Sequence, residues 1–281
     1  MPAEPPLDLD VGVIYTHERD YMTRLISSLA ESGHGLRQRL ILVDNCSSTG
    51  VSEWASIYPE SVILRNEKRL GYAPNLNRIL NRSTARYVLL LNTDMWFDPA
   101  EQTLSKLVQF MDAHPECGVS GCRLYHADGS YAYPARRFQT LSTIAARRLR
   151  LGSVLQGTVE SYLYQHQPVT ATYDCDWLSG CLLMTRRQAA LQIGGLDTGF
   201  AKYFEDVDFC LRMSRHGWRV MFHGGTYAWH DEQRASQKLF SIDSWRHLRS
   251  YARWLTKWGF DPAQEARSLS ALHRAACAAR A

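Results

Sequence analysis

The chain has 281 residues, of which 45% are hydrophobic and 21% are charged, and its formal net charge is +4. This composition is ordinary for a soluble globular protein with one large domain or two small ones. The mild positive charge permits an anionic partner such as a nucleotide or a lipid surface, and we expect no nucleic-acid partner.

Nothing in the sequence predicts export or a membrane span. Residues 1–10 are rich in proline and acidic residues and lack an apolar core, so we expect no signal peptide. No apolar run approaches the ~20 residues that a transmembrane helix needs. The seven cysteines are scattered without a CxxC pair, which favours reduced, buried thiols in a cytoplasmic protein.

The first part of the chain alternates predicted strands with predicted helices. Apolar runs at 11–15, 39–43, 62–64 and 87–91 indicate buried strands, and helical spacing of apolar residues follows at 21–29, 71–80 and 99–114. Continuous apolar strands separated by helices predict an α/β fold with a mostly parallel sheet and helices on both faces.

Polar clusters follow three of these strands, at 16–19, 44–48 and 92–94. Ligands of open α/β sheets bind beyond the carboxyl ends of the strands, so these clusters predict a ligand site, although strand ends also carry polar turns for structural reasons. A GxGxxG dinucleotide motif is absent from the first turn.

The middle of the chain changes character. Residues 125–131 indicate a hairpin with Asp128-Gly129 as its turn. Five arginines then fall in the weakly periodic stretch 136–157, which is either a solvated basic face or a segment that meets the acceptor or a membrane. Residues 177–185 predict a strand, and 186–193 a helix.

A glycine-punctuated loop leads into a helix whose first turn carries Glu205, Asp206 and Asp208. Acidic residues at a helix start are favoured by the helix dipole, by ~0.3–1 kcal/mol each, which is the structural explanation. Three carboxylates exceed that need, and a carboxylate fixed there can also accept a proton from a substrate hydroxyl.

The rest of the chain reads as a short strand at 218–222, a loop containing Gly224, Gly225 and His230, and a helix over 237–260. Aromatic and basic residues interleave in this helix, so it either packs on the parent domain or lies at a membrane surface. A final amphipathic helix is expected at 263–280.

Seven segments, in order, resemble motifs of the family 2 glycosyltransferases, which use the GT-A fold, and the rhamnosyltransferase-like branch is the most similar. They are Leu42-Val43-Asp44-Asn45-Cys46-Ser47-Ser48, Gly71 to Asn77, Leu89 to Asp94, Gly121 to Phe138, Asp176 to Gly180, Tyr203 to Cys210, and His230. Two positions depart from the family pattern: Asn92 replaces the first aspartate of a DxD motif, and Glu18 stands where asparagine is usual.

The resemblance implies a role for each matching residue. It implies a nucleotide-sugar site formed by Thr16, Glu18, Asp44, Asn77, Asn92, Thr93 and Asp94, with Asp44 contacting the base of the nucleotide. Asp94 and His230 are expected to bind Mn²⁺ or Mg²⁺. Asp206 is the expected general base, and Glu205 or Asp208 the next candidate. The acceptor would meet Trp177, Ser179, Gly180 and Glu205, with core packing as the structural alternative for Trp177.

The resemblance implies transfer of a sugar, with inversion, to a glycan or lipid-linked glycan in bacterial surface polysaccharide assembly. The first choice of donor is thymidine diphosphate rhamnose, and the second is a uridine diphosphate sugar. The alternatives are a nucleotidyltransferase, which would need a glycine- and lysine-rich loop after the first strand, and a non-catalytic sugar-binding protein. We expect a disordered tail at 1–9, a catalytic domain at 10–234 divided at residue 124, and a helical extension at 235–281. We expect a cytoplasmic protein, with the C-terminal helix as a candidate peripheral contact with the inner face of the membrane.

Overall fold

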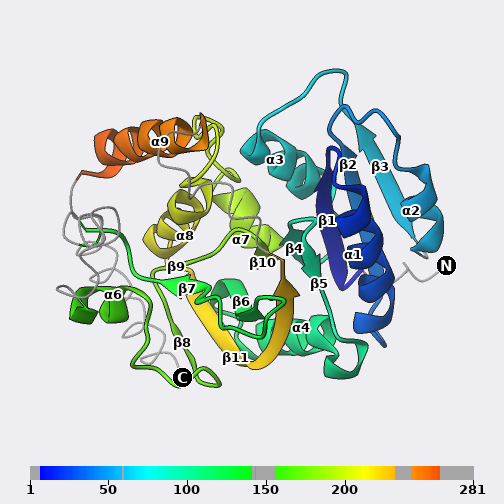
Figure 1. Cartoon of the computed structure of the whole chain (residues 1–281). Coiled ribbons are helices and arrows are strands. Elements are labelled where there is room, and N and C mark those ends of the chain that lie inside the picture. The colour runs from blue at the N-terminus through cyan, green and yellow to red at the C-terminus, as the bar shows by residue number, and fades with distance from the viewer. Residues whose placement is uncertain (1–6, 59, 141–142, 144–155, 232–241, 260–281) are drawn as a thin grey trace.

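The computed structural model describes residues 7–58, 60–140, 143, 156–231 and 242–259 (Figure 1). Within these residues the centre of the fold is a nine-stranded sheet in the order β3-β2-β1-β4-β10-β6-β11-β5, with β8 beside β11. Neighbouring strands from β3 to β4 are parallel, as are β6 and β11, whereas β10, β5 and β8 run antiparallel to their partners. The predicted α/β fold with a mostly parallel sheet is confirmed.

The first half of the chain follows the predicted alternation closely. Its elements are β1 (Leu9–Tyr15), α1 (Arg19–Ser32), β2 (Gln38–Asp44), α2 (Ser52–Ile57), β3 (Ser61–Arg65), α3 (Tyr72–Arg82) and β4 (Tyr87–Leu91). Because β1, β2 and β4 are parallel, their polar carboxyl ends meet at one edge of the sheet.

The second half of the chain supplies the remaining strands of the sheet and the helices that pack around them. It contains β5 (Met95–Trp96), η1 (Pro99–Glu101), α4 (Thr103–Ala113), β6 (Cys117–Tyr125), β7 (Ala135–Arg136), α6 (Gln156–Tyr162), β8 (Thr172–Asp174), β9 (Trp177–Leu178), β10 (Leu182–Arg186), α7 (Arg187–Gln192), α8 (Glu205–Arg215), β11 (Arg219–His230) and α9 (Ile242–Trp258). The predicted turn at Asp128-Gly129 is confirmed, because Gly129 has a φ of +82° and Tyr125 pairs with Tyr131.

Helices cover both faces of the sheet and create two apolar cores. Side chains alternate along each strand, so Val11 and Leu89 face the core beneath α1, α2 and α4, whereas Ile41 and Val88 face the core beneath α3, α7 and α8. Both cores consist of buried side chains, and full burial of each Val, Leu, Ile, Phe or Met among them stabilises the fold by ~1.5–3 kcal/mol.

Three local expectations were wrong. Strand β11 does not end at Phe222: it bulges at Gly224 and Gly225, where its register against β6 shifts, and continues to His230, which is therefore a strand residue. The predicted strand at 177–185 is split into β9 and β10 by Ser179-Gly180-Cys181. Cys46 is exposed, whereas the other five described cysteines are buried.

The aromatic stripe of α9 divides into two groups. Trp254 is 1% exposed and packs among the residues of α8, whereas Trp245 is 74% exposed and Leu248 is 45% exposed. Among the described side chains of α9, packing on the domain is established for His247 and Trp254 and not for Trp245 or Leu248. Across the described residues, no helix combines the length and the hydropathy needed to span a bilayer.

The chain ends fall largely beyond what the structure describes. The expected tail at 1–9 overlaps β1, which begins at Leu9, and residues 1–6 lie outside the described residues, as do the expected helix at 263–280, Cys277, and the arginines at 147, 148 and 150.

Candidate active site

The edge beyond β4 is tied to the second half of the chain by hydrogen bonds. The Asn92 amide donates to the carbonyl of Cys181 at 3.0 Å, and its side-chain oxygen accepts from the Tyr72 hydroxyl at 2.7 Å. The same hydroxyl lies 3.1 Å from the carbonyl of Gly180. Asn92 therefore connects α3 to the turn between β9 and β10. These bonds also hold the start of the segment that contains Thr93 and Asp94.

Strand pairing places Asp94 beside His230. Met95 of β5 pairs with His230 of β11, and the Asp231 amide donates to the Asp94 carbonyl at 2.9 Å. His230 Nε2 consequently lies 3.4 Å from Asp94 Oδ1, and the two side chains are only 11% and 16% exposed. Residues 136 positions apart in the chain thus form one polar pair.

The pair fits a divalent cation. Asp94 Oδ1 is buried and accepts no hydrogen bond from any described residue, with His230 as its ion-pair neighbour, so this oxygen could coordinate a cation. Burial lowers the pKa of His230, but the neighbouring Cys181 and Asp94 raise it to about 11. Without a metal the ring therefore holds a proton, which a bound cation would have to displace because imidazole ligates a metal only in its neutral form. No group of three or more ligand side chains occurs within the described ranges, so the protein itself would supply two ligands.

The first turn of α8 lies opposite this pair. Asp206 Oδ2 accepts the Gly180 amide at 2.9 Å, and Oδ1 accepts the amide of Val207 at 2.9 Å. A Cβ at position 180 would lie 3.2 Å from Cβ and Oδ2 of Asp206, so a larger residue would press on the carboxylate. Tyr203 and Phe204 precede the helix with φ values of 69° and 68°, a left-handed conformation that non-glycine residues rarely adopt.

Burial raises the pKa of both acidic residues at the start of α8. For Glu205, burial and then the charge of Asp206 raise the pKa to about 8, and its buried Oε2 accepts no bond from any described donor. For Asp206, burial raises the pKa, and the amides of Gly180 and Val207 lower it in part. Two adjacent carboxylates with elevated proton affinity are suited to accepting a proton.

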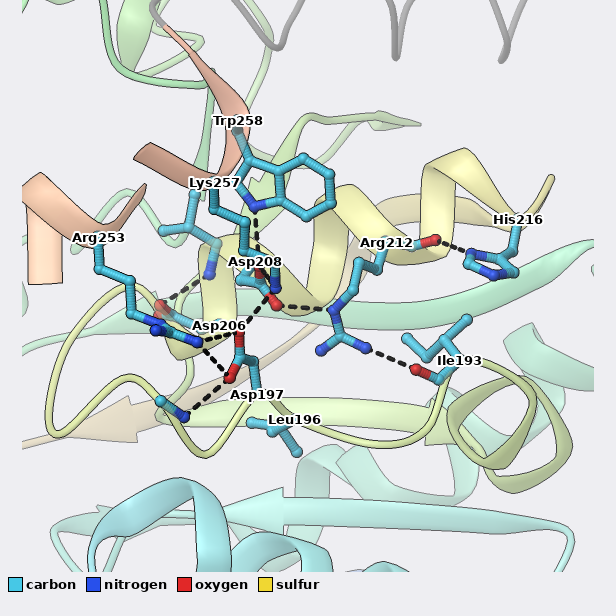
Figure 2. A network of polar contacts seen from close by, with 12 residues as sticks. Ile193, Leu196, Asp197, Asp206, Asp208, Arg212, His216, Arg253, Lys257 and Trp258 are labelled. Carbon is cyan, nitrogen blue, oxygen red and sulfur yellow. Dashed lines mark hydrogen bonds and ion pairs between the residues drawn. The ribbon is translucent and has the colours of Figure 1, made fainter. Parts of the chain in front are cut away.

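Asp208 belongs to a different environment, although it shares the same helical turn. Its side chain is fully buried and accepts hydrogen bonds from Arg212 Nε at 2.7 Å, Lys257 Nζ at 2.7 Å and Trp258 Nε1 at 2.8 Å (Figure 2). Asp197 extends this network through Lys257 and Arg253. Asp208 therefore joins α8 to α9 and is not a reserve base.

A cavity of about 700 Å³ brings most of the expected site residues together. It is lined by Asn92, Asp94, Trp177, Ser179, Gly180, Glu205, Asp206 and His230. The expected nucleotide residues Thr16, Glu18, Asp44, Asn77 and Thr93 do not line it. Asp44 ends β2 at the same sheet edge and accepts the Ser47 amide through Oδ1 at 2.8 Å.

Three of the expected contact residues use their side chains for hydrogen bonds within the protein. Asn77 exchanges two hydrogen bonds, each 2.8 Å long, with the backbone of Leu196, so it fastens α3 to the loop before α8. Glu18 accepts the His17 amide at 3.0 Å and shapes its own loop. Trp177 is 4% exposed, and its indole donates to the Arg137 carbonyl at 2.7 Å, so packing explains it better than sugar stacking.

The sequence did not reveal several residues that line the same cavity, namely Gly71, Tyr72, Arg136, Gln139, Cys181, Ala201, Lys202, Tyr203, Phe204, Val207, Arg246 and His247. The signals for some of them were the family-like segments at 71–77, 121–138 and 203–210, and the basic residues of the C-terminal helix. Neither signal indicated which side chains would face the cavity.

The comparisons with known proteins agree with this geometry. The model for "Glycosyl transferase family 2" matches residues 10–191. An N-acetylglucosaminyl-diphospho-decaprenol L-rhamnosyltransferase of Mycobacterium tuberculosis is 26% identical over 65% of this chain, and the match spans 63% of that protein. The rhamnosyltransferase WbbL of Escherichia coli is 27% identical over 87% of this chain and 91% of its own.

Solved structures share the fold. A mannosyltransferase from Pyrobaculum calidifontis, in complex with GDP-Man and Mn²⁺, has a TM-score of 0.61 at 18% identity and covers 99% of this chain and 76% of its own. GalNAc-T7, with UDP, GalNAc and Mn²⁺, has a TM-score of 0.62 at 15% identity over 91% of this chain and 48% of its own.

Proposed function

The chain belongs to glycosyl transferase family 2, and from this membership we propose that it transfers a sugar, with inversion, from a nucleotide diphosphate to a glycan or lipid-linked glycan acceptor. The observation that carries the proposal is the cavity in which Asp206 and Glu205 share one space with Asp94 and His230. Asp206 and Glu205 suit proton transfer, and a cation held by Asp94 and His230 would suit the charge of a diphosphate.

In the proposed reaction, an acceptor hydroxyl oxygen forms a bond to the anomeric carbon while the bond from that carbon to the diphosphate oxygen breaks. The hydroxyl proton passes to Asp206, and the nucleoside diphosphate leaves with the electron pair. Asp206 suits this role because the Gly180 and Val207 amides fix both of its oxygens. A positioned base of this kind contributes ~10²–10⁴-fold.

Glu205 would assist without replacing Asp206. With a pKa of about 8, Glu205 is largely protonated at neutral pH and can donate a hydrogen bond to an acceptor oxygen. The proton on Glu205 also removes a second negative charge from the side of Asp206, which makes a single ionised base easier to maintain.

Asp94 and His230 would hold Mn²⁺ or Mg²⁺, and the chemistry that such an ion supplies is neutralisation of the charge that builds up on the leaving diphosphate. The proposal is supported by the buried oxygen Asp94 Oδ1 and by the Mn²⁺ bound in two solved structures that share the fold. With two protein ligands, the remaining coordination falls to phosphate oxygens and water.

The nucleotide would lie over the carboxyl ends of β1 and β2, with Asp44 and Thr16 as the proposed contacts to its base. Rhamnose from a thymidine diphosphate donor is the first choice because two relatives are named rhamnosyltransferases. A uridine diphosphate sugar is the second choice. A surface polysaccharide precursor at the inner face of the bacterial membrane is the proposed setting, with α9 as its peripheral contact.

The test is sugar transfer measured with dTDP-rhamnose and with UDP-sugars, in Mn²⁺, in Mg²⁺ and in EDTA. We expect metal-dependent release of one nucleoside diphosphate, which Asp94→Ala abolishes. Asp112→Ala is the matched control, because Asp112 pairs with Arg86 and Tyr87 at the start of β4, away from the cavity. Full activity of Asp94→Ala would remove the metal assignment, and absence of transfer with every donor would favour a non-catalytic sugar-binding protein.

A further inference from the structure

Tyr72 is the first residue of α3, and its side chain lines the cavity. Its hydroxyl oxygen lies 2.7 Å from Asn92 Oδ1 and 3.1 Å from the carbonyl oxygen of Gly180. Asn92 directly follows β4, and Gly180 lies in the turn between β9 and β10. One hydroxyl group therefore contacts both the segment that leads to Asp94 and the turn that contacts Asp206.

The backbone that carries Tyr72 is held by asparagine side chains. Asn75 Nδ2 donates to the Gly71 carbonyl at 3.0 Å, and Asn45 Nδ2 donates to the Leu70 carbonyl at 3.2 Å. The Tyr72 side chain also packs against the core beneath α3, α7 and α8. The hydroxyl therefore has a defined position from which it can fix its two partners.

The Tyr72 hydroxyl keeps its proton at neutral pH. Burial, followed by the charge of Glu205, raises the pKa of Tyr72 well above its usual value of 10. A tyrosine hydroxyl carries a single proton, so it cannot donate fully to two oxygens at once. The shorter distance favours donation to Asn92, and the contact with the Gly180 carbonyl is the weaker of the two. Removal of the hydroxyl should therefore cost about one hydrogen bond and not two.

The turn between β9 and β10 is held from two sides. On one side, the Cys181 carbonyl accepts the Asn92 amide at 3.0 Å, and the Gly180 carbonyl faces the Tyr72 hydroxyl. On the other side, the Gly180 amide donates to Asp206 Oδ2 at 2.9 Å. A shift of this turn would therefore move a hydrogen-bond donor of the proposed base.

We propose that Tyr72 is a positioning residue, whose hydroxyl keeps the metal segment (residues 92–94) at a fixed separation from the turn that supports Asp206. The inference rests on the proposed function, because it assigns a further residue to that reaction. Displacement with inversion needs the attacking oxygen and the leaving diphosphate on opposite sides of the anomeric carbon, so the base and the cation site must keep their separation. Tyr72 exchanges no proton with the substrate and acts through Asn92 and Gly180.

The test is the substitution Tyr72→Phe, which removes the hydroxyl and keeps the ring. Because one hydrogen bond is lost, we expect kcat for sugar transfer to fall about ten-fold and the donor KM to change less than about two-fold. The matched control is Tyr87→Phe, because the Tyr87 hydroxyl donates to Asp112 at 2.6 Å and Tyr87 does not line the cavity. The control should leave kcat unchanged, and a normal kcat in Tyr72→Phe would overturn the inference.

The Asp206→Asn background separates positioning from a general structural effect. If Tyr72 acts through the base, Tyr72→Phe should lower kcat by less than about two-fold in an enzyme that already lacks the Asp206 carboxylate, because the two substitutions then remove one shared effect. The same loss of kcat in both backgrounds would show that Tyr72 acts independently of Asp206, and would overturn the inference.

Amide hydrogen exchange tests the link without any donor or acceptor. The exchange rate over residues 179–181, measured by mass spectrometry, should rise about ten-fold in Tyr72→Phe and stay unchanged in Tyr87→Phe. An unchanged rate in Tyr72→Phe would overturn the inference whatever the activity. Absence of transfer by the wild type with every donor, together with faster exchange in Tyr72→Phe, would instead refute the proposed function, while the hydrogen-bonded link itself stands.

Discussion

The buried carboxylate of Asp208 allows a stability prediction with a worked magnitude. Asp208 has a fully buried side chain and receives Lys257 Nζ, Arg212 Nε and Trp258 Nε1 at 2.7, 2.7 and 2.8 Å (Figure 2). The substitution Lys257→Met removes one of its two cations and keeps a side chain of similar length. The remaining carboxylate is then buried with less compensation for its lost hydration.

Removing one partner of a buried ion pair costs ~3–5 kcal/mol. Here Arg212 and Trp258 remain, and Lys257 is 27% exposed, so we expect a smaller loss. We therefore predict a decrease of about 2–3 kcal/mol in the free energy of unfolding, or a Tm lower by about 5–10 °C for a chain of this length.

Equilibrium unfolding in urea measures this loss, with Lys106→Met as the control. Lys106 Nζ lies 2.8 Å from Glu101 Oε1, almost the same distance, but Lys106 is 42% exposed. An exposed pair contributes ~0–1 kcal/mol, so the control should change little. Equal losses in the two variants would refute the argument that burial, and not ion-pair distance, determines the contribution.

Three further predictions concern the proposed base. Asp206→Asn should lower kcat by ~10²–10⁴-fold with little change in the donor KM; near-normal kcat would move the base to Glu205. Gly180→Ala should also lower kcat, because the new Cβ would lie 3.2 Å from the Asp206 carboxylate, and steady-state kinetics with an unchanged kcat would show that Asp206 can shift freely. For Glu205, burial raises the folded-state pKa from 4.5 to about 8, so wild-type stability should fall as pH rises through that window. Glu205→Gln should therefore gain in Tm over the wild type between pH 5 and pH 9, whereas an equal difference at both pH values would contradict the assignment.

The family resemblance, and not the local pattern of the chain, predicted that Asp94 and His230 act together. The paired strands β5 and β11 bring them side by side. The sequence did not predict hydrogen bonds between a side chain and backbone groups that are far away along the chain. Asn77 and Leu196 are 119 positions apart, and no periodicity indicates that their groups will exchange hydrogen bonds.

The C-terminal helix is a second example of a feature that the sequence could not predict. Its aromatic stripe predicted an apolar face but could not say that Trp254 would be buried and Trp245 exposed. That division depends on how α9 crosses α8, which Lys257 and Trp258 determine through Asp208. Long-range polar contacts of this kind leave no pattern in either segment alone.

Helical geometry explains how one turn of α8 serves two purposes. Successive residues of a helix are rotated by about 100°, so Asp206 and Asp208 point about 160° apart. Asp208 therefore faces α9 while Asp206 faces Gly180. The three donors on Asp208 fix the rotation of α8 about its axis, and the same rotation aims Asp206 at the cavity. Lys257→Met should consequently lower kcat as well as stability, although Lys257 does not line the cavity.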